Sequence, residues 1–313
     1  MTNNSIQRVA VIGTGLIGAS WATVFLARGL DVIAYDVALN AEAALREAID
    51  RHWPAMRHLG LANGASTDRL KFCSSVEQAV EEAQFVQESG PERLDFKHAI
   101  FAAMDAASQA SVVLASSSST IRVTEFQDVC SHPERVVLGH PFNPPHIIPL
   151  VEVIGGQRTS QTAIDTAMAF YAACGKHPIR LRREIRGHIA NRLQAALWQE
   201  AFHLVESGVA TVADIDAAIA HGPGLRWALL GPFLNLHLSG GQGGMTHFLS
   251  HLGPAIEAMW RDLGKVSLTP ECKAAVVTGV NEQLAGRDLP ATIQDRDRLL
   301  IELLRAKDAS VLS

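Results

Sequence analysis

The sequence predicts an α/β fold built on a mostly parallel sheet, followed by a smaller all-helical domain. Up to about residue 183, short apolar runs rich in β-branched residues alternate with segments of helical periodicity, which is typical of parallel βαβ units. After Arg186, apolar residues recur only at three- and four-residue spacing, which indicates helices alone. A chain of 313 residues is long enough for two domains, which we expect in residues 1–186 and 187–313.

The elements of this fold can be assigned in chain order. The hydrophobic runs predict strands at 9–12, 31–35, 85–87, 112–115, 136–139, 150–154 and 178–181. Helices are expected at 19–28, 41–58, 75–83, 94–107 and 160–174. In the second domain one helix should end at Gly208, and Thr211 should cap a helix at 212–220, with Asp214 as the acid of a capping box.

A glycine-rich turn follows the first predicted strand. Gly13, Gly15 and Gly18 permit a tight turn and close approach of the backbone to a pyrophosphate, which would bind at the N-terminus of the next helix. Asp36 ends the second strand, near the offset of the acid that accepts hydrogen bonds from ribose hydroxyls. This order favours a dinucleotide-binding Rossmann domain over an unrelated glycine turn. The acid, with no Arg or Lys before Arg46, favours NAD over NADP.

A second motif joins a histidine to a proline-rich turn. His140 enters Pro141-Phe142-Asn143-Pro144-Pro145, a segment that cannot form a helix and does not favour a central strand. Glu152 follows in an apolar predicted strand, where a buried carboxylate needs a partner, and His140 is the available one. Such a pair fixes the imidazole tautomer and stabilises the imidazolium, as a general base requires. The alternative is a structural turn with a surface histidine and an edge-strand glutamate.

With these motifs the chain resembles, over essentially its whole length, the L-3-hydroxyacyl-CoA dehydrogenase family. Within it, the chain is more similar to the branch that acts on free β-hydroxy acids, which includes enzymes of L-carnitine and L-gulonate and λ-crystallin. The resemblance implies that His140 is the catalytic base, that Glu152 orients it, and that Ser119 and Asn191 position the substrate oxygen. The expected cofactor-binding residues are Gly13, Gly15, Leu16, Ile17, Gly18, Asp36, Glu92, Lys97, Ser117 and Asn143, with Glu92 and Lys97 near the nicotinamide ribose.

Two segments depart from the family pattern. Residues 116–119 are an unbroken serine run, which leaves open which hydroxyl meets the substrate. Serines at a strand end also commonly satisfy loop backbone groups. Where the family has Pro-Gly-Phe ahead of the asparagine helix, this chain has Arg186-Gly187-His188.

The substrate class depends on Arg226 and Trp227. Members that act on free acids resemble this chain there, and the planar fork of Arg suits a carboxylate. Trp227 could stack on that Arg or face a cationic group; the alternative is a surface Arg beside a core Trp. Residues 240–248 resemble carnitine dehydrogenases, whereas Gly231-Pro232 resembles gulonate dehydrogenases, so the choice of acid stays open.

The expected activity is therefore NAD-dependent oxidation of the 3-hydroxyl of a small free β-hydroxy acid to the 3-keto acid. One alternative is a 3-hydroxyacyl-CoA ester such as 3-hydroxybutyryl-CoA as substrate. The other is a λ-crystallin-like structural or NAD-sensing protein. The resemblance also implies a homodimer formed through the C-terminal helical domain.

Composition excludes several other classes. A net charge of −5 without a basic tract argues against nucleic-acid binding. Four cysteines without C-x-x-C spacing indicate reduced thiols. His247 and His251 have the spacing of metal ligands but no third ligand, so we expect no metal. No apolar run reaches membrane-spanning length and the start lacks a signal-peptide pattern, which predicts a cytoplasmic protein.

Overall fold

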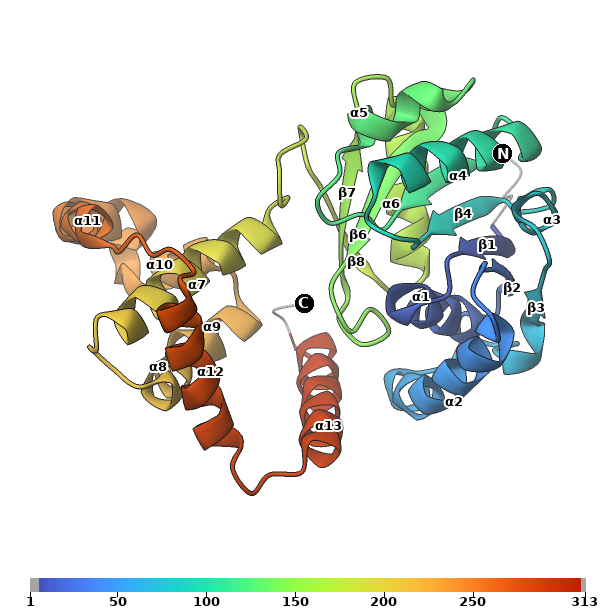
Figure 1. Cartoon of the computed structure of the whole chain (residues 1–313). Coiled ribbons are helices and arrows are strands. Elements are labelled where there is room, and N and C mark those ends of the chain that lie inside the picture. Colours follow the sequence, from blue (N-terminus) through green and yellow to red (C-terminus); the bar gives the residue numbers. More distant parts are fainter. Residues whose placement is uncertain (1–5, 311–313) are drawn as a thin grey trace. The chain divides into compact units, whose positions relative to one another are not determined.

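In the computed structural model, which describes residues 6–310, the chain forms two units (Figure 1). The first ends at Ala190 and the second begins at Asn191. The first is built on one eight-stranded sheet with the strand order β3-β2-β1-β4-β5-β6-β7-β8. Its strands are β1 (Arg8–Ile12), β2 (Asp31–Tyr35), β3 (Leu70–Phe72), β4 (Phe85–Glu88), β5 (Val113–Ser116), β6 (Val136–Pro141), β7 (Leu150–Gly155) and β8 (His177–Arg180).

The mostly parallel sheet confirms the predicted fold class. Every pairing is parallel except β6 with β7, which run antiparallel. Residues 142–149 connect these two strands and are too few for the crossover that a parallel pair requires. Strand β3 was not predicted, because its three residues place the exposed Lys71 between two apolar ones and give no apolar run.

The turn was expected to begin at His140, and this was wrong. Strand β6 continues to Pro141, so His140 lies within the sheet. The neighbouring strand β5 pairs with β6 only as far as Leu138. Pro141 therefore has strand pairing on one side alone, and such an edge position is where a sheet tolerates proline.

Helices cover both faces of the sheet. Helices α1 (Leu16–Ala27), α2 (Ala41–Leu59) and α6 (Gln161–Ala173) pack in one core with Trp21, Phe25 and Tyr171. Helices α3 (Val76–Val80), α4 (Leu94–Ala107) and α5 (Val123–Phe126) pack in the other with Phe101 and Phe126. Short 3₁₀ turns lie at η1 (Thr67–Arg69), η2 (Gln127–Val129) and η3 (Pro133–Arg135). Because β1, β4 and β5 are parallel, the segments that follow them meet at one edge of the sheet.

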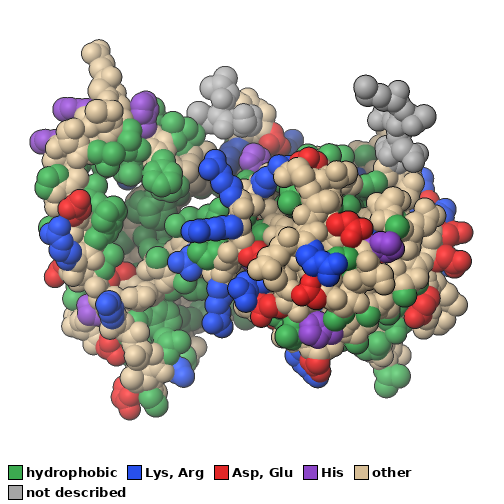
Figure 2. Space-filling view, turned by 90° about the horizontal axis from the view of Figure 1, so that it is seen from above, with side chains coloured by type: hydrophobic (Ala, Val, Ile, Leu, Met, Phe, Trp, Pro, Cys, Tyr) green, Lys and Arg blue, Asp and Glu red, His purple; other side chains and the backbone are tan. Residues whose placement is uncertain are grey.

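The second unit is helical, as predicted. It comprises α7 (Ala190–Glu206), α8 (Val212–Ala220), α9 (Pro223–Leu229), α10 (Pro232–Ser239), η4 (Gly241–Gly243), α11 (Gly244–Asp262), α12 (Pro270–Leu284) and α13 (Leu289–Asp308). Thr211 caps α8 by accepting from the N–H of Asp214, as predicted. Among its described residues, the buried hydrophobic side chains are Phe248, Cys272 and Ile301. Many large apolar side chains are exposed, and Figure 2 shows hydrophobic atoms over much of the visible face of this unit.

Two further expectations concern the whole chain. Across residues 6–310 no helix combines the length and the apolar character needed to cross a membrane. Cys73, Cys130, Cys174 and Cys272 are all buried and form no disulfide.

Candidate active site

The glycine turn lies between β1 and α1, at the carboxyl edge of the sheet. Gly13 has φ +88°, and a Cβ there would meet the backbone of Gly90 at 2.7 Å, so only glycine fits. A Cβ on Gly18 would lie 1.8 Å from the Gly13 carbonyl oxygen. On Gly15, by contrast, a Cβ would find nothing within 4 Å, so the backbone there faces open space. The first helical bond runs from the Ala19 N–H to the Gly15 carbonyl, which leaves the amides of Leu16, Ile17 and Gly18 for an anion.

Asp36 lies beside this turn. One carboxylate oxygen accepts from the Thr14 N–H at 2.6 Å and the other from the Ala38 N–H at 2.9 Å. These bonds hold the carboxylate at the end of β2, next to the open face of Gly15. The geometry fits the pyrophosphate and the adenosine ribose of a dinucleotide.

A buried ion pair stabilises the carboxyl end of β4. The Lys97 ammonium donates to both oxygens of Glu88 at 2.8 Å, and the two side chains are 1% and 0% exposed. Glu88 also accepts from the Gly90 N–H and the Ser116 hydroxyl. Lys97 therefore has no face open to a ligand in this structure, and it stabilises the turn against which Gly13 packs. Glu88 was missed in the sequence, although an acid closing an apolar strand is a signal of this kind.

His140 and Glu152 lie directly opposite each other on the antiparallel strands β6 and β7. His140 Nδ1 is 2.9 Å from Glu152 Oε2, and the carboxylate is fully buried. Because a carboxylate accepts, Nδ1 carries the proton and Nε2 presents a lone pair. The structure thus brings together the two residues that the sequence paired across twelve positions.

The other oxygen of Glu152 holds the segment after the sheet. Oε1 accepts from the backbone N–H groups of Ile189 at 2.8 Å and Ala190 at 3.0 Å. Burial alone would raise the pKa of Glu152, but the hydrogen bonds from His140, Ala190 and Ile189 outweigh it and lower that pKa. The carboxylate is therefore ionised at neutral pH and stabilises a positive charge on His140.

The serine loop follows β5, and its hydroxyls differ in their contacts. Ser116 donates to Glu88, and Ser117 accepts from the Trp21 indole at 3.2 Å and the Gln87 amide at 2.9 Å. Ser118 donates to Glu92 at 2.7 Å. The hydroxyl of Ser119 has no partner among the described residues and is the one available to a ligand.

Glu92 organises this loop. Its Oε1 accepts from the backbone N–H groups of Ser119, Thr120 and Ile121 as well as from two hydroxyls. Burial would raise the pKa of Glu92, but these bonds and the charge of Lys97 lower it. Glu92 thus fixes the backbone on which Ser119 is carried. Asn143 is exposed on the loop that follows β6.

His188 is a residue that the sequence did not assign to the site. Its ring is 3% exposed, and its centroid lies 4.9 Å from that of His140. Neither ring nitrogen has a hydrogen-bond partner among the described residues, and the backbone has φ +52°. An unpaired buried polar group costs about 1–3 kcal/mol, and a left-handed non-glycine residue adds roughly 1–2 kcal/mol. The only sequence signal was the departure from the family's phenylalanine.

The remaining predicted site residues belong to the second unit. Asn191 is its first residue and directly follows Ala190, whose N–H binds Glu152. Arg226 and Trp227 lie on α9, where both side chains are exposed, Trp227 by 44%. Arg226 has no side-chain partner among the described residues.

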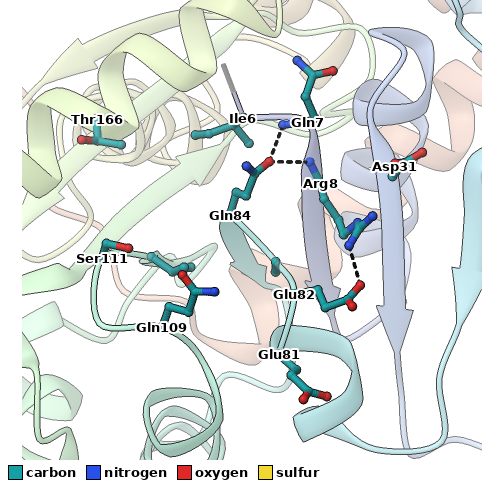
Figure 3. Close-up of a pocket in the computed structure, with 12 residues that line it drawn as sticks. Ile6, Gln7, Arg8, Asp31, Glu81, Glu82, Gln84, Gln109, Ser111 and Thr166 are labelled. Carbon is teal, nitrogen blue, oxygen red and sulfur yellow. Dashed lines mark hydrogen bonds and ion pairs between the residues drawn. The ribbon is translucent and has the colours of Figure 1, made fainter. Parts of the chain in front are cut away.

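In the first unit, a surface depression lies at the opposite edge of the sheet from the glycine turn and His140. It measures about 630 Å³ and is lined at the amino ends of β1 and β4 by Arg8, Glu82 and Gln84 (Figure 3). Arg8 pairs with Glu82, and Gln84 accepts from the backbone of Gln7 and Arg8. The Arg8–Glu82 ion pair of this depression therefore stabilises the edge of the sheet. In residues 6–310 no group of three or more His, Cys, Asp or Glu side chains could hold a metal.

Two family models together match most of the chain. The model of the 3-hydroxyacyl-CoA dehydrogenase NAD-binding domain matches residues 8–185, and that of the family's C-terminal domain matches residues 187–267. The L-carnitine dehydrogenase of Streptomyces griseus is 52% identical over 96% of this chain and 90% of its own length. That of Pseudomonas putida is 46% identical over 98% and 96%.

Two solved structures are also similar to this chain. The crystal structure of 5-formyl-3-hydroxy-2-methylpyridine 4-carboxylic acid 5-dehydrogenase, described as an NAD⁺-dependent dismutase, matches with a TM-score of 0.82 and 28% identity, over 97% of this chain and 99% of that one. The 3-hydroxybutyryl-CoA dehydrogenase of Escherichia coli matches with a TM-score of 0.65 and 27% identity, over 88% of this chain and 57% of that one.

Proposed function

Because the chain belongs to the 3-hydroxyacyl-CoA dehydrogenase family and is an NAD-dependent oxidoreductase, we propose that it oxidises the 3-hydroxyl of L-carnitine to the 3-keto acid. The observation that carries the chemistry is the His140–Glu152 pair at the carboxyl edge of the sheet. The carnitine enzymes share far more of their residues with this chain than the CoA-ester enzyme does, which supports a free acid as the substrate.

His140 acts as the general base in this proposal. Its Nε2 lone pair takes the proton of the 3-hydroxyl, and ionised Glu152 stabilises the imidazolium that forms. NAD⁺ bound at the glycine turn supplies the acceptor for the hydride of the carbinol carbon. Asp36 would hold the adenosine ribose, and the Gly15 and Leu16 backbone the pyrophosphate. Asn143 and Ser117 belong to the proposed cofactor-binding set. Lys97 would act on the cofactor only indirectly, through the turn that it braces.

Ser119 and Asn191 position the substrate oxygen in this proposal. Support for Ser119 over its neighbours comes from the hydrogen bonds that occupy Ser116, Ser117 and Ser118. Glu92 fixes the Ser119 backbone, so the hydroxyl is presented from a rigid loop.

Arg226 is proposed to bind the substrate carboxylate, and Trp227 to face the trimethylammonium group. A guanidinium gives two parallel charge-assisted bonds to a carboxylate. An indole face attracts a quaternary ammonium by its negative quadrupole. Both side chains are exposed on α9 and are free for such contacts.

Steady-state NADH formation with L-carnitine, L-gulonate, 3-hydroxybutyrate and 3-hydroxybutyryl-CoA tests the substrate. We expect the highest kcat/KM with L-carnitine. Turnover of the CoA ester alone would establish the alternative function.

A variant, Arg226→Leu, tests the carboxylate contact. Losing a charge-assisted bond costs about 1.5–3 kcal/mol, roughly ten- to a hundredfold in kcat/KM. This loss should appear with L-carnitine and be small with its methyl ester. Arg261→Leu, which removes an exposed arginine paired with Glu257 in the same unit, is the matched control. Equal losses with acid and ester would make Arg226 structural.

We further propose that the chain acts in the cytoplasm as a homodimer formed through its helical unit. The reduced, buried cysteines and the exposed apolar side chains of that unit support these two statements.

A further inference from the structure

The loop formed by residues 142–149 joins β6 to β7 and carries Asn143, which belongs to the proposed cofactor-binding set. His140 lies on β6, so the hydride acceptor of NAD⁺ has to come close to this part of the sheet. Asp36, proposed to hold the adenosine ribose, follows β2, and strands β1, β4 and β5 lie between β2 and β6. Asn143 therefore belongs to the nicotinamide half of the cofactor site, an inference that rests on the proposed function.

Lys176 lies in the turn before β8 and holds this loop. Its ammonium donates to the carbonyl oxygen of Pro145 and, at 3.1 Å, to that of Ile148. Between these two acceptors His146 is buried, and its Nδ1 lies 3.3 Å from the Ser20 hydroxyl on α1. Hydrogen bonds from an ammonium are roughly twice as strong as neutral ones. One cation thus fixes the loop at two points, and one imidazole joins the loop to α1.

The same ammonium is linked to a second segment. It lies 5.6 Å from the centre of the Trp21 ring, which is fully buried, so water does little to screen the attraction between cation and ring. The Trp21 indole N–H donates to the hydroxyl of Ser117 at 3.2 Å. Ser117 also belongs to the proposed cofactor-binding set. Lys176 therefore acts on the Asn143 loop directly and on the serine loop through Trp21.

The position of Lys176 is itself fixed, and its charge is costly to keep there. Its backbone N–H donates to the Tyr171 carbonyl at 3.0 Å, and Arg28 donates to the Cys174 carbonyl at 3.0 Å. Burial lowers the pKa of Lys176 to about 7; Cys174 opposes this effect and the charge of Arg28 adds to it. Among the described residues no carboxylate pairs with the ammonium, so the loop carbonyls and the Trp21 ring are what stabilise its charge. Lysines perturbed in this way cluster at functional sites.

We propose that Lys176 is a positioning residue for the nicotinamide half of NAD, which holds Asn143 and Ser117 where they bind the cofactor and does not itself touch it. The ammonium is what position 176 contributes, because the aliphatic stem alone offers no donor to the loop. Its loss should leave the glycine turn and Asp36 unchanged, since among the described residues no contact joins Lys176 to either.

Calorimetric titration with NAD⁺ and with ADP separates the two halves of the site. ADP needs only the glycine turn and Asp36, whereas NAD⁺ also needs the segments that Lys176 holds. The first variant is Lys176→Met, which keeps the stem and removes the ammonium. The second is Lys176→Gln, which keeps an N–H donor without the charge and retains part of the bonding where the methionine variant is unstable. Lys71→Met, which changes an exposed lysine of β3, is the matched control.

We expect Lys176→Met to weaken NAD⁺ binding about tenfold, the lower end of the loss of a hydrogen bond to a charged group, and Lys176→Gln to weaken it less. ADP affinity should stay at the wild-type value in both variants, and the control should bind both ligands normally. Equal weakening of NAD⁺ and ADP would show general damage to the domain and would overturn the proposal. Unchanged NAD⁺ affinity in both variants would also overturn it.

A double-mutant cycle with Asn143→Ala tests whether the lysine acts through the loop. Two residues that act through one contact are not additive, so Lys176→Met should cost much less NAD⁺ affinity when Asn143 is already alanine. A full tenfold loss in that background as well would show that Lys176 does not position Asn143 and would overturn the proposal. These measurements report binding, so they are independent of the substrate. Absence of NADH formation from L-carnitine in the wild type would instead contradict the proposed function.

Discussion

At the scale of single residues, His140 should carry most of the acid–base chemistry. His140→Ala removes the proton acceptor but leaves the glycine turn and Asp36 untouched. We expect kcat to fall by about 10²–10⁴-fold, the usual contribution of a positioned acid–base group. NAD affinity, measured by calorimetric titration, should stay close to that of the wild type. Near-normal turnover would remove His140 from the mechanism.

His188 should also make the stability of the fold depend on pH. Its pKa is lowered from 6.5 by burial, so as pH falls the unfolded chain takes up a proton before the folded chain does. Stability linked to this group is thus present above about pH 6.5 and is lost as pH falls below it. His188→Phe should therefore flatten the decline of Tm between about pH 7 and pH 5. Any strain that the substitution adds to the backbone is the same at each pH. The change of Tm with pH therefore reports the titration of His188. If the Tm of the wild type and that of the variant fall in parallel as pH is lowered, His188 is not the source of the pH dependence.

At the scale of elements, two glycines of the β1–α1 turn have different roles: Gly15 leaves room for the cofactor, and Gly18 permits close packing of the backbone. Gly15→Ala adds a methyl group facing open space, so Tm should hold while NAD affinity falls by about 1.5–3 kcal/mol, roughly ten- to a hundredfold, as the pyrophosphate is displaced from the amides. Gly18→Ala forces a methyl group against the Gly13 carbonyl and should destabilise the fold by about 1–3 kcal/mol. Thermal melts and NAD titration of both variants check this. An unchanged NAD affinity in Gly15→Ala would place the phosphates elsewhere.

The same elements show what a sequence can predict. Strands such as β2 have apolar runs, and the pairing of His140 with Glu152 follows from the rule that a buried acid needs a partner. The burial of Lys97 was not predictable, because its partner Glu88 becomes its neighbour only when α4 packs on the sheet. For His188, the chain gave no pattern beyond an unexpected residue type, since its contact with His140 depends on the path of the chain after β8.

At the scale of the whole molecule, the helical unit buries few of its apolar side chains. Phe248, Cys272 and Ile301 are buried, whereas Trp198, Phe233 and Trp260, among others, are exposed. Such a surface is stabilised when a second copy covers it. Sedimentation velocity at micromolar concentration should give twice the mass of one chain, and Trp260→Asp is expected to shift the equilibrium toward monomer if Trp260 lies in that interface. A wild-type chain that sediments as a monomer would contradict the dimer.

Glu152 has a consequence for the modular history of such two-domain enzymes. One carboxylate binds the base through Oε2 and the N–H groups of residues 189 and 190 through Oε1. A recombination that joins the first domain of one relative to the second domain of another therefore keeps every group that satisfies this carboxylate unchanged when the crossover falls after Ala190. Hybrid enzymes joined at that point should keep the His140–Glu152 pair intact. A new substrate-binding domain could then be acquired without changes around the catalytic base.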